Sequence, residues 1–279
     1  MANVPLDPNA PYALLMHSYV ELRPMDFAPL VAQALGIVPA DAAHQLRRQQ
    51  GIITRSAPLA RVRALGQQLA QCNVPTFALP AEHLAALPPV AQIHSATWDQ
   101  QHFWPLYDVQ GTTEPVPWAS LLIFGLGEVT HTTVTRKTES DPGAQRAGAA
   151  IGFAAGGIVG AAIGASIGGA TGTRTKRVEK EERLVTLDLV SLQPPRRFRI
   201  EMGGFNFQVL GPEVQPSTRE NIRRLLAKLI AWCPHVRTTT TPEELYAPGR
   251  FHTAQFDSER DFEARLEWML NCALHAPQA

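Results

Sequence analysis

His94, Asp99 and His102 are the closest cluster of metal-capable side chains in the sequence. Imidazole and carboxylate groups can hold a zinc ion or transfer protons when a fold brings them together. The spacing of these three residues matches no metal-binding or catalytic motif whose mechanism is understood. We therefore expect isolated surface histidines here, and we keep a soluble enzyme with a site near His94–His102 as an alternative.

Other patterns that carry chemistry are absent or incomplete. The sequence contains no nucleophile elbow, no Walker loop and no paired-histidine zinc motif. Gly125 and Gly127 lack the third glycine and the following helix of a phosphate loop, so they predict a turn between two strands. Asp257, Glu259 and Asp261 stand at a predicted helix start, where carboxylates favour the dipole. We predict no catalytic residue, no metal site and no cofactor.

The most regular pattern is a glycine at every fourth position between residues 147 and 173, a segment without charged residues. This spacing aligns the glycines in a stripe along a helix. Each glycine costs roughly 1 kcal/mol of helix stability relative to alanine, and close approach of helix backbones, most often in membranes, offsets such a cost. The predicted membrane or oligomer contacts are Gly148, Gly152, Gly156, Gly160, Gly164, Gly168, Gly172, Ile151, Phe153, Ile158, Val159, Ile163 and Ile167.

Basic residues flank this glycine zipper on both sides. Arg146 precedes it, and Arg174, Lys176 and Arg177 follow it. Cations at the ends of an apolar segment suit anionic lipid headgroups, so these four side chains are headgroup candidates. The alternative is that any apolar insert needs polar flanks.

The segments around the zipper favour a helical hairpin over a single span. Thr130–Lys137 and Arg177–Leu187 have the alternating pattern of adjacent antiparallel strands, which would start both ends of the zipper on the same side. The double glycine at Gly156 and Gly157 is the predicted turn. Arms of about 10 and 15 residues are too short to cross a bilayer. The alternative is a poorly ordered Gly/Ala loop.

Composition narrows the class of protein further. Lys+Arg and Asp+Glu each number 25, so the formal net charge is zero, and we expect no nucleic-acid partner. Cys72, Cys233 and Cys272 are far apart and odd in number, which favours a reducing compartment. Residues 1–11 lack the basic and apolar regions of a signal peptide. We expect a protein at the cytoplasmic face, peripherally or monotopically associated with a membrane.

Residues 1–86 are predicted to form a small domain with the element order β-α-α-β-α-β. Arg47, Arg48, Arg55, Arg61 and Arg63 make this part basic; a phosphate or acidic-peptide site is one interpretation, and solvated helix faces are the other. The order of elements and the stretch "ALGI…DAAHQLRRQQGII" resemble the C-terminal domain of the ribosomal stalk protein and the ClpS adaptor fold. The resemblance implies a binding module with a peptide or protein ligand and no catalytic residues.

Residues 90–235, with 144–173 as an insert, read as about seven strands, the last at Phe205–Leu210, followed by one amphipathic helix. Ser217 and Glu220 form a capping box at the start of that helix. The run "VTLDLVSL…RRFRIEM…FNFQVLG" and the capped helix resemble the bacterial PH-like (pleckstrin-homology-like) barrel. The remaining residues, 236–279, are a helical extension whose last helix, about Ser258–Leu274, is expected to pack against the barrel.

The sequence thus predicts an α+β protein with an adaptor-like N-terminal domain, a PH-like barrel and a glycine-zipper hairpin. The expected function is a non-enzymatic, membrane-associated or self-associating adaptor or scaffold that presents a small binding module. Its partners would be a membrane surface, further copies of the chain through 147–173, or both. A pore- or assembly-forming effector that uses the zipper is the other alternative to the enzyme named above.

Overall fold

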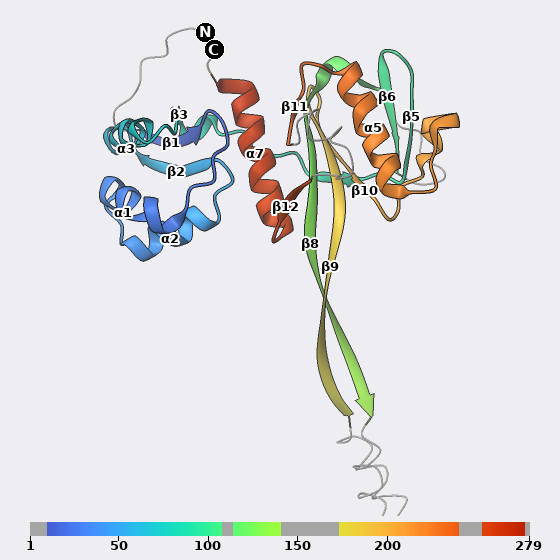
Figure 1. Ribbon diagram of the computed structural model, residues 1–279, viewed down its shortest axis with the longest axis horizontal. Helices are drawn as coiled ribbons and strands as arrows, with labels where there is room; N and C mark the ends of the chain where they lie inside the picture. Colours follow the sequence, from blue (N-terminus) through green and yellow to red (C-terminus); the bar gives the residue numbers. More distant parts are fainter. Residues whose placement is uncertain (1–9, 108–113, 141–172, 240–252, 277–279) are drawn as a thin grey trace, which may run out of the picture. The chain divides into compact units, whose positions relative to one another are not determined.

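A computed structural model describes residues 10–107, 114–140, 173–239 and 253–276 (Figure 1). Side chains are described in these ranges except at 132–140 and 173–181. The chain divides into two compact units, Met1–Thr130 with Arg183–Ala279, and His131–Glu182. The candidate site described below lies entirely in the first unit.

The N-terminal elements follow the predicted β-α-α-β-α-β order. They are β1 (Pro11–Met16), α1 (Pro24–Leu35), α2 (Pro39–Arg47), β2 (Ile52–Pro58), α3 (Leu59–Gln71) and β3 (Thr76–Pro80). The strands form an antiparallel sheet in the order β2-β1-β3, so β2 and β3 are its edges. Prolines at the first positions of α1 and α2 suit helix starts, and Gly36 ends α1 in the left-handed conformation.

The second sheet has six strands, with the path β11-β8-β9-β10-β4 and β12 beside β8. Its strands are β4 (Val90–Gln92), β8 (Leu121–Ser140), β9 (Thr173–Leu192), β10 (Pro195–Glu201), β11 (Arg237–Thr238) and β12 (Ala254–Phe256). The segments Thr130–Lys137 and Arg177–Leu187 belong to β8 and β9. These two strands are neighbours in this sheet, as predicted.

Two local predictions in this region were wrong. Gly125 and Gly127 do not form a turn but lie within β8, which is continuous. A Cβ at Gly125 would collide with Leu266, and one at Gly127 would crowd Phe256 and Phe262, so these glycines allow close packing on the strand. The strand predicted at Phe205–Leu210 is instead part of η3 (Phe207–Glu213), a 3-10 segment that the Asn206 side chain caps.

A third sheet contains three strands in the order β5-β6-β7. It consists of β5 (Ser95–Trp98), β6 (His102–Leu106) and β7 (Val116–Pro117). The 3-10 turn η2 (Trp118–Ser120) follows β7, and η1 (Ala81–His83) precedes β4. Helix α5 (Thr218–Trp232) begins at the predicted capping box, where Ser217 Oγ accepts a 3.4 Å hydrogen bond from the Glu220 amide. Its apolar face packs on this sheet and on β9 and β10 in one buried cluster.

Helix α7 (Glu259–His275) lies between the N-terminal module and β8, rather than against a barrel alone as predicted (Figure 1). Leu266 contacts β8 on one side. On the other side Trp268 Nε1 donates a 2.9 Å hydrogen bond to the Met16 carbonyl, and Cys272 Sγ lies 3.4 Å from the same oxygen. One apolar cluster therefore joins the N-terminal module, α7 and one face of the second sheet, while α5 covers the other face.

The fold class is α+β, as predicted. The described strands form three separate sheets and do not close into a barrel. Both faces of the second sheet are covered, which explains the nearly continuous apolar run Leu121–Phe124 at the start of β8.

Candidate functional site

The residues predicted to contact a membrane or another copy, Gly148–Gly172 with their apolar neighbours, lie outside the described residues, and so does Arg146. Arg174, Lys176 and Arg177 fall in the first part of β9, where the backbone alone is described. The zipper and headgroup contacts therefore stay predictions from the sequence.

Asp99 and His102 lie at the turn between β5 and β6, whereas His94 precedes β5 at the other end of the hairpin, where its amide donates a 3.0 Å hydrogen bond to the Leu106 carbonyl. Asp99 Oδ1 accepts hydrogen bonds of 2.7 Å from the amides of Gln101 and His102, and these bonds lower the pKa of Asp99. His102 Nδ1 is 3.7 Å from the same oxygen. In this arrangement Asp99 closes a tight turn, and the described part of the chain contains no group of three metal-capable side chains.

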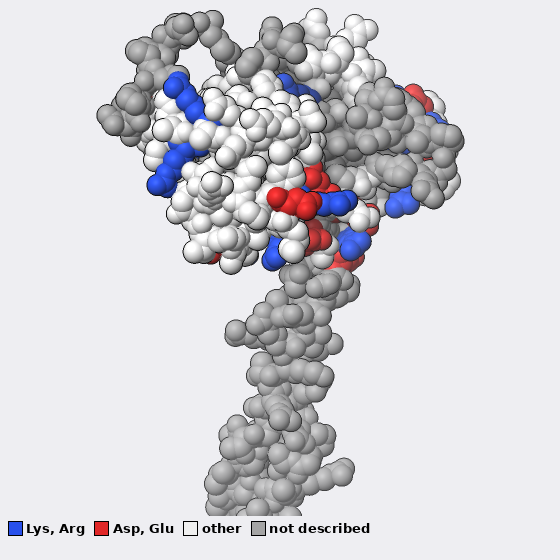
Figure 2. All heavy atoms as spheres, turned by 60° about the vertical axis from the view of Figure 1, so that its left-hand side comes forward, with Lys and Arg blue, Asp and Glu red and all other residues white. Residues whose placement is uncertain are grey.

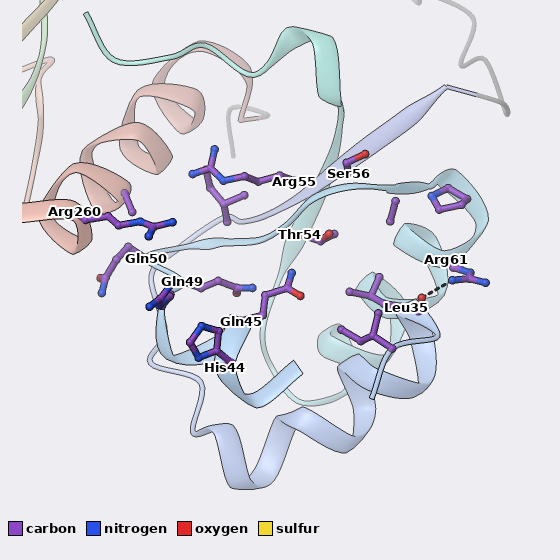
Figure 3. A pocket seen from close by; sticks show the side chains of 16 residues that line it. Leu35, His44, Gln45, Gln49, Gln50, Thr54, Arg55, Ser56, Arg61 and Arg260 are labelled. Carbon is purple, nitrogen blue, oxygen red and sulfur yellow. Dashed lines mark hydrogen bonds between the residues drawn. The ribbon is translucent and has the colours of Figure 1, made fainter. Parts of the chain in front are cut away.

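A pocket of about 640 Å³ lies along β2, between the end of α2, the start of α3 and one face of α7. Four arginines line it, namely Arg48, Arg55, Arg61 and Arg260, and no carboxylate is among its described lining residues (Figure 3). Figure 2 shows one face of the molecule, and charged side chains are sparse over most of the described surface in that view. A cavity of this size with several convergent polar groups is typical of a ligand site. We define it as the arginine pocket.

Two of these arginines are held in place by contacts within the fold. Arg55 forms two parallel hydrogen bonds with Glu267 of α7, of 2.6 and 2.7 Å, which raise the pKa of its guanidinium. Arg61 donates to the carbonyl of Leu35 at the end of α1 and covers Gly36, where a Cβ would crowd the guanidinium. Arg61 still has unused N–H donors, whereas Arg55 is neutralised by its partner.

Glutamines form the floor of the pocket near the start of β2. Gln45 Nε2 donates a 2.8 Å hydrogen bond to the carbonyl of Ile53, and Gln49 Nε2 donates to the same oxygen. Gln49 Oε1 is buried and has no hydrogen-bond partner in the described chain. A buried acceptor of this kind costs free energy unless a donor reaches it, so the floor has an unused acceptor beside the cationic side chains.

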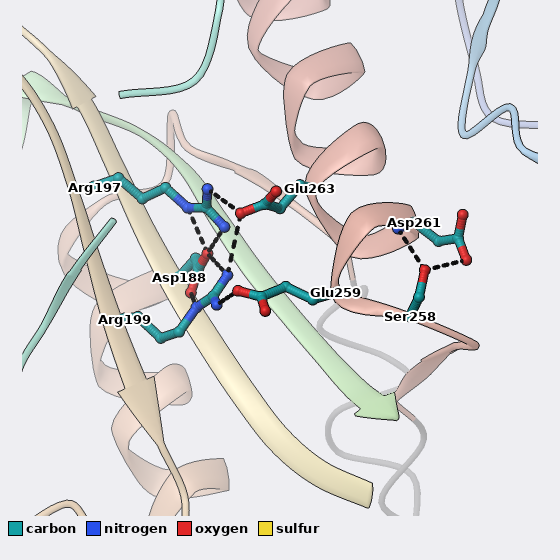
Figure 4. A network of polar contacts seen from close by, with 7 residues as sticks. All are labelled: Asp188, Arg197, Arg199, Ser258, Glu259, Asp261 and Glu263. Carbon is teal, nitrogen blue, oxygen red and sulfur yellow. Dashed lines mark hydrogen bonds and ion pairs between the residues drawn. The ribbon is translucent and has the colours of Figure 1, made fainter. Parts of the chain in front are cut away.

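A second polar cluster, drawn in Figure 4, has a buried centre, whereas its two glutamates, Glu259 and Glu263, are 45 % and 40 % exposed. Asp188 of β9 is 0 % exposed, and it lies between Arg197 and Arg199 of β10, which are 3 % and 4 % exposed. Arg199 and Asp188 are direct cross-strand partners. Burial disfavours the charged form of Arg199, but the hydrogen bonds and charges of Asp188 and Glu259 outweigh burial and raise its pKa.

Helix α7 completes this cluster with two glutamates from its first turns. Arg197 Nη1 donates a 2.8 Å hydrogen bond to Glu263, and Arg199 Nη1 donates to Glu259. Arg197 Nη2 lies 2.7 Å from Asp188 Oδ2 at an angle that makes no hydrogen bond. The cluster fixes α7 on the sheet, and its closed geometry is that of a structural ion-pair network.

Sequence reasoning missed two features of the arginine pocket. Arg260 and Ala264 come from α7, about two hundred residues after the rest of the lining, and no local pattern connects them to it. Of the five N-terminal arginines singled out, Arg48, Arg55 and Arg61 line the pocket, whereas Arg47 and Arg63 do not.

No family model, curated protein or solved structure matches the chain. Within the described ranges, every helix is too short or too polar to cross a membrane.

Proposed function

We propose that this chain is a non-enzymatic adaptor whose N-terminal module binds an anionic group in the arginine pocket. The observation that carries the proposal is the arginine pocket itself, a cavity with four guanidinium groups and no carboxylate among its described lining residues. Guanidinium groups bind carboxylate and phosphate oxygens with paired hydrogen bonds. The likeness to the stalk-protein and ClpS adaptor folds is part of this proposal, and the β-α-α-β-α-β order supports it.

The same proposal assigns the glycine zipper, 147–173, to attachment at a membrane surface or to self-association. Its support is the unbroken spacing of four in the sequence, together with the neighbouring positions of β8 and β9, which precede and follow the segment. Strands that are neighbours in one sheet suit a segment that leaves and returns on the same side.

The PH-like likeness of residues 90–235 also belongs to the proposal. In its favour, β8, β9 and β10 are consecutive neighbours in one sheet, and the amphipathic helix α5 follows them in the chain and packs on that sheet. No ligand is assigned to this part of the chain.

Anion binding can be tested by thermal unfolding of the full chain with inorganic pyrophosphate. A ligand that binds only the native state raises the melting temperature as its concentration increases. We expect such a rise for the parent and none for the Arg48→Ala/Arg260→Ala variant, with sodium chloride at matched ionic strength as the control. Equal curves for the two proteins would refute the anion site.

Attachment can be tested by sedimentation with anionic vesicles and by light scattering. The full chain should pellet with vesicles or form oligomers, and a variant without residues 144–173 should do neither. Concentration-dependent leakage of vesicle contents would instead favour the pore-forming alternative.

A further inference from the structure

The arginine pocket is elongated, and its length follows one edge strand. Its lining includes Ile52 and Thr54–Pro58, nearly the whole of β2. In the described sheet β2 pairs only with β1, so its other edge has no strand partner among the described residues. Since a strand rises about 3.3 Å per residue, a seven-residue strand extends roughly 20 Å. A single phosphate or carboxylate group cannot reach both ends of such a pocket.

The positive charges are placed at the two ends of β2. Figure 3 shows Arg260 near Gln50 on one side of the pocket and Arg61 near Leu35 on the opposite side. No carboxylate lies within ion-pair distance of Arg48, Arg61 or Arg260 in the described part of the chain, whereas Arg55 is paired with Glu267. The uncompensated charges therefore call for a ligand with separated negative groups.

The lining between the two ends is aliphatic and polar. Leu35, Ile37 and Ala264 contribute apolar surface, and the residues of β2 include Thr54 and Ser56 with hydroxyl groups. The described lining includes no Phe, Tyr or Trp on which nucleic-acid bases could stack. An extended peptide fits this surface, because its alternate side chains can meet apolar and basic positions along an edge strand.

We propose that the arginine pocket binds an acidic peptide segment of a partner protein, extended along β2 with carboxylates at both Arg260 and Arg61. This inference rests on the proposed anion-binding function and specifies its ligand. Arg48, two residues before Gln50 in the chain, adds a further positive charge to the lining.

The test uses the full chain and a fluorescein-labelled extended peptide of about eight residues, long enough to run along all of β2. The peptide has glutamates at both ends and valine and threonine between them. Fluorescence anisotropy at low ionic strength should give saturable binding, and replacing all glutamates by glutamine should weaken it at least about tenfold, since charge-assisted hydrogen bonds are lost. Added salt should weaken binding of the acidic peptide.

Variants at each end decide whether the peptide spans the pocket. Arg260→Ala and Arg61→Gln should each weaken binding about five- to tenfold; glutamine at 61 keeps a donor for the Leu35 carbonyl. Arg63→Ala, an exposed arginine on the same helix as Arg61 but outside the pocket, should leave binding unchanged. A peptide with glutamates at one end only should respond to just one of the two pocket variants.

The outcomes separate this inference from the proposed function. Pyrophosphate stabilisation without peptide binding would overturn the peptide and leave the anion site. An equal loss in Arg63→Ala would show diffuse attraction and overturn the pocket as the binding surface. Tighter binding of a single-stranded oligonucleotide than of the acidic peptide, with the same arginine dependence, would replace the peptide by a nucleic acid.

Discussion

The indole ring of Trp268 lies directly over Gly51, at the turn that leads into β2. A Cβ at Gly51 would overlap the five-membered ring of the indole, and the backbone of Gly51 has φ of +108°. The indole nitrogen also donates its hydrogen bond to Met16, so one side chain of α7 closes the N-terminal module at two points.

Replacing Gly51 by alanine should therefore destabilise the protein strongly. Overpacking costs about 1–3 kcal/mol, and the positive φ adds about 1–2 kcal/mol for a residue with a Cβ. Urea unfolding followed by tryptophan fluorescence would measure the loss. Gly203→Ala is the matched control, because a Cβ there meets nothing within 4 Å, and it should change stability by less than about 1 kcal/mol. A Gly51→Ala protein as stable as the control would contradict the contact.

The buried ion-pair network should be far more sensitive than the surface pairs. Asp188→Asn keeps the shape of the side chain but leaves Arg197 and Arg199 without their buried carboxylate, which should cost about 3–5 kcal/mol. Glu114→Gln removes the partner of Arg196 at the surface, where the glutamate is 77 % exposed, and should cost about 0–1 kcal/mol. Similar losses in the two variants would show that the network does not hold α7.

Local patterns predicted the parts of this fold that local interactions stabilise. The capping box at Ser217 and the helix that begins near Ser258 were predicted, because their caps are hydrogen bonds between residues that are close in sequence. The glycines of β8 could not be read in the same way, because a contact with Leu266 and a turn both require a residue without a side chain.

Only part of the candidate site could be predicted from the sequence, for a similar reason. Arg48, Arg55 and Arg61 are close in sequence, so their shared positive charge was visible. Arg260 joins them because α7 packs against the N-terminal module through Trp268 and Cys272, and tertiary contacts of that range leave no local pattern.

The three cysteines should differ sharply in reactivity. Cys72 is exposed, while burial raises the pKa of Cys233 to about 11 and that of Cys272 to about 12. Since the thiolate is the reactive form, a thiol reagent near pH 8 should modify Cys72 in the native protein and the other two only after denaturation. Rapid modification of all three in the native protein would show that α5 and α7 open readily.

The same burial predicts a loss of stability at high pH. The folded-state pKa values lie above the unfolded value near 9, so the buried thiols stabilise the fold fully below pH 9, and that stabilisation is lost as pH rises toward 11–12. Each thiol contributes a slope of up to about 1.4 kcal/mol per pH unit. In urea unfolding at pH values from about 8 to about 11, the free energy of unfolding should decline less steeply with pH in the Cys233→Ala/Cys272→Ala variant than in the parent. Identical slopes would contradict the assignment.

The glycine zipper should be a packing surface rather than a tolerated loop. Isoleucine at Gly152 and Gly160 would put branched side chains where backbones are expected to touch, and this should reduce membrane pelleting and cross-linking. In a helix exposed to water the same changes should instead favour the helix, because glycine is the poorer helix former. Isoleucine at Ala154 and Ala162, which lie off the stripe in the same segment, is the matched control and should preserve association. If the glycine variant stays as membrane-bound and as oligomeric as the parent while becoming more stable, the packing role is wrong.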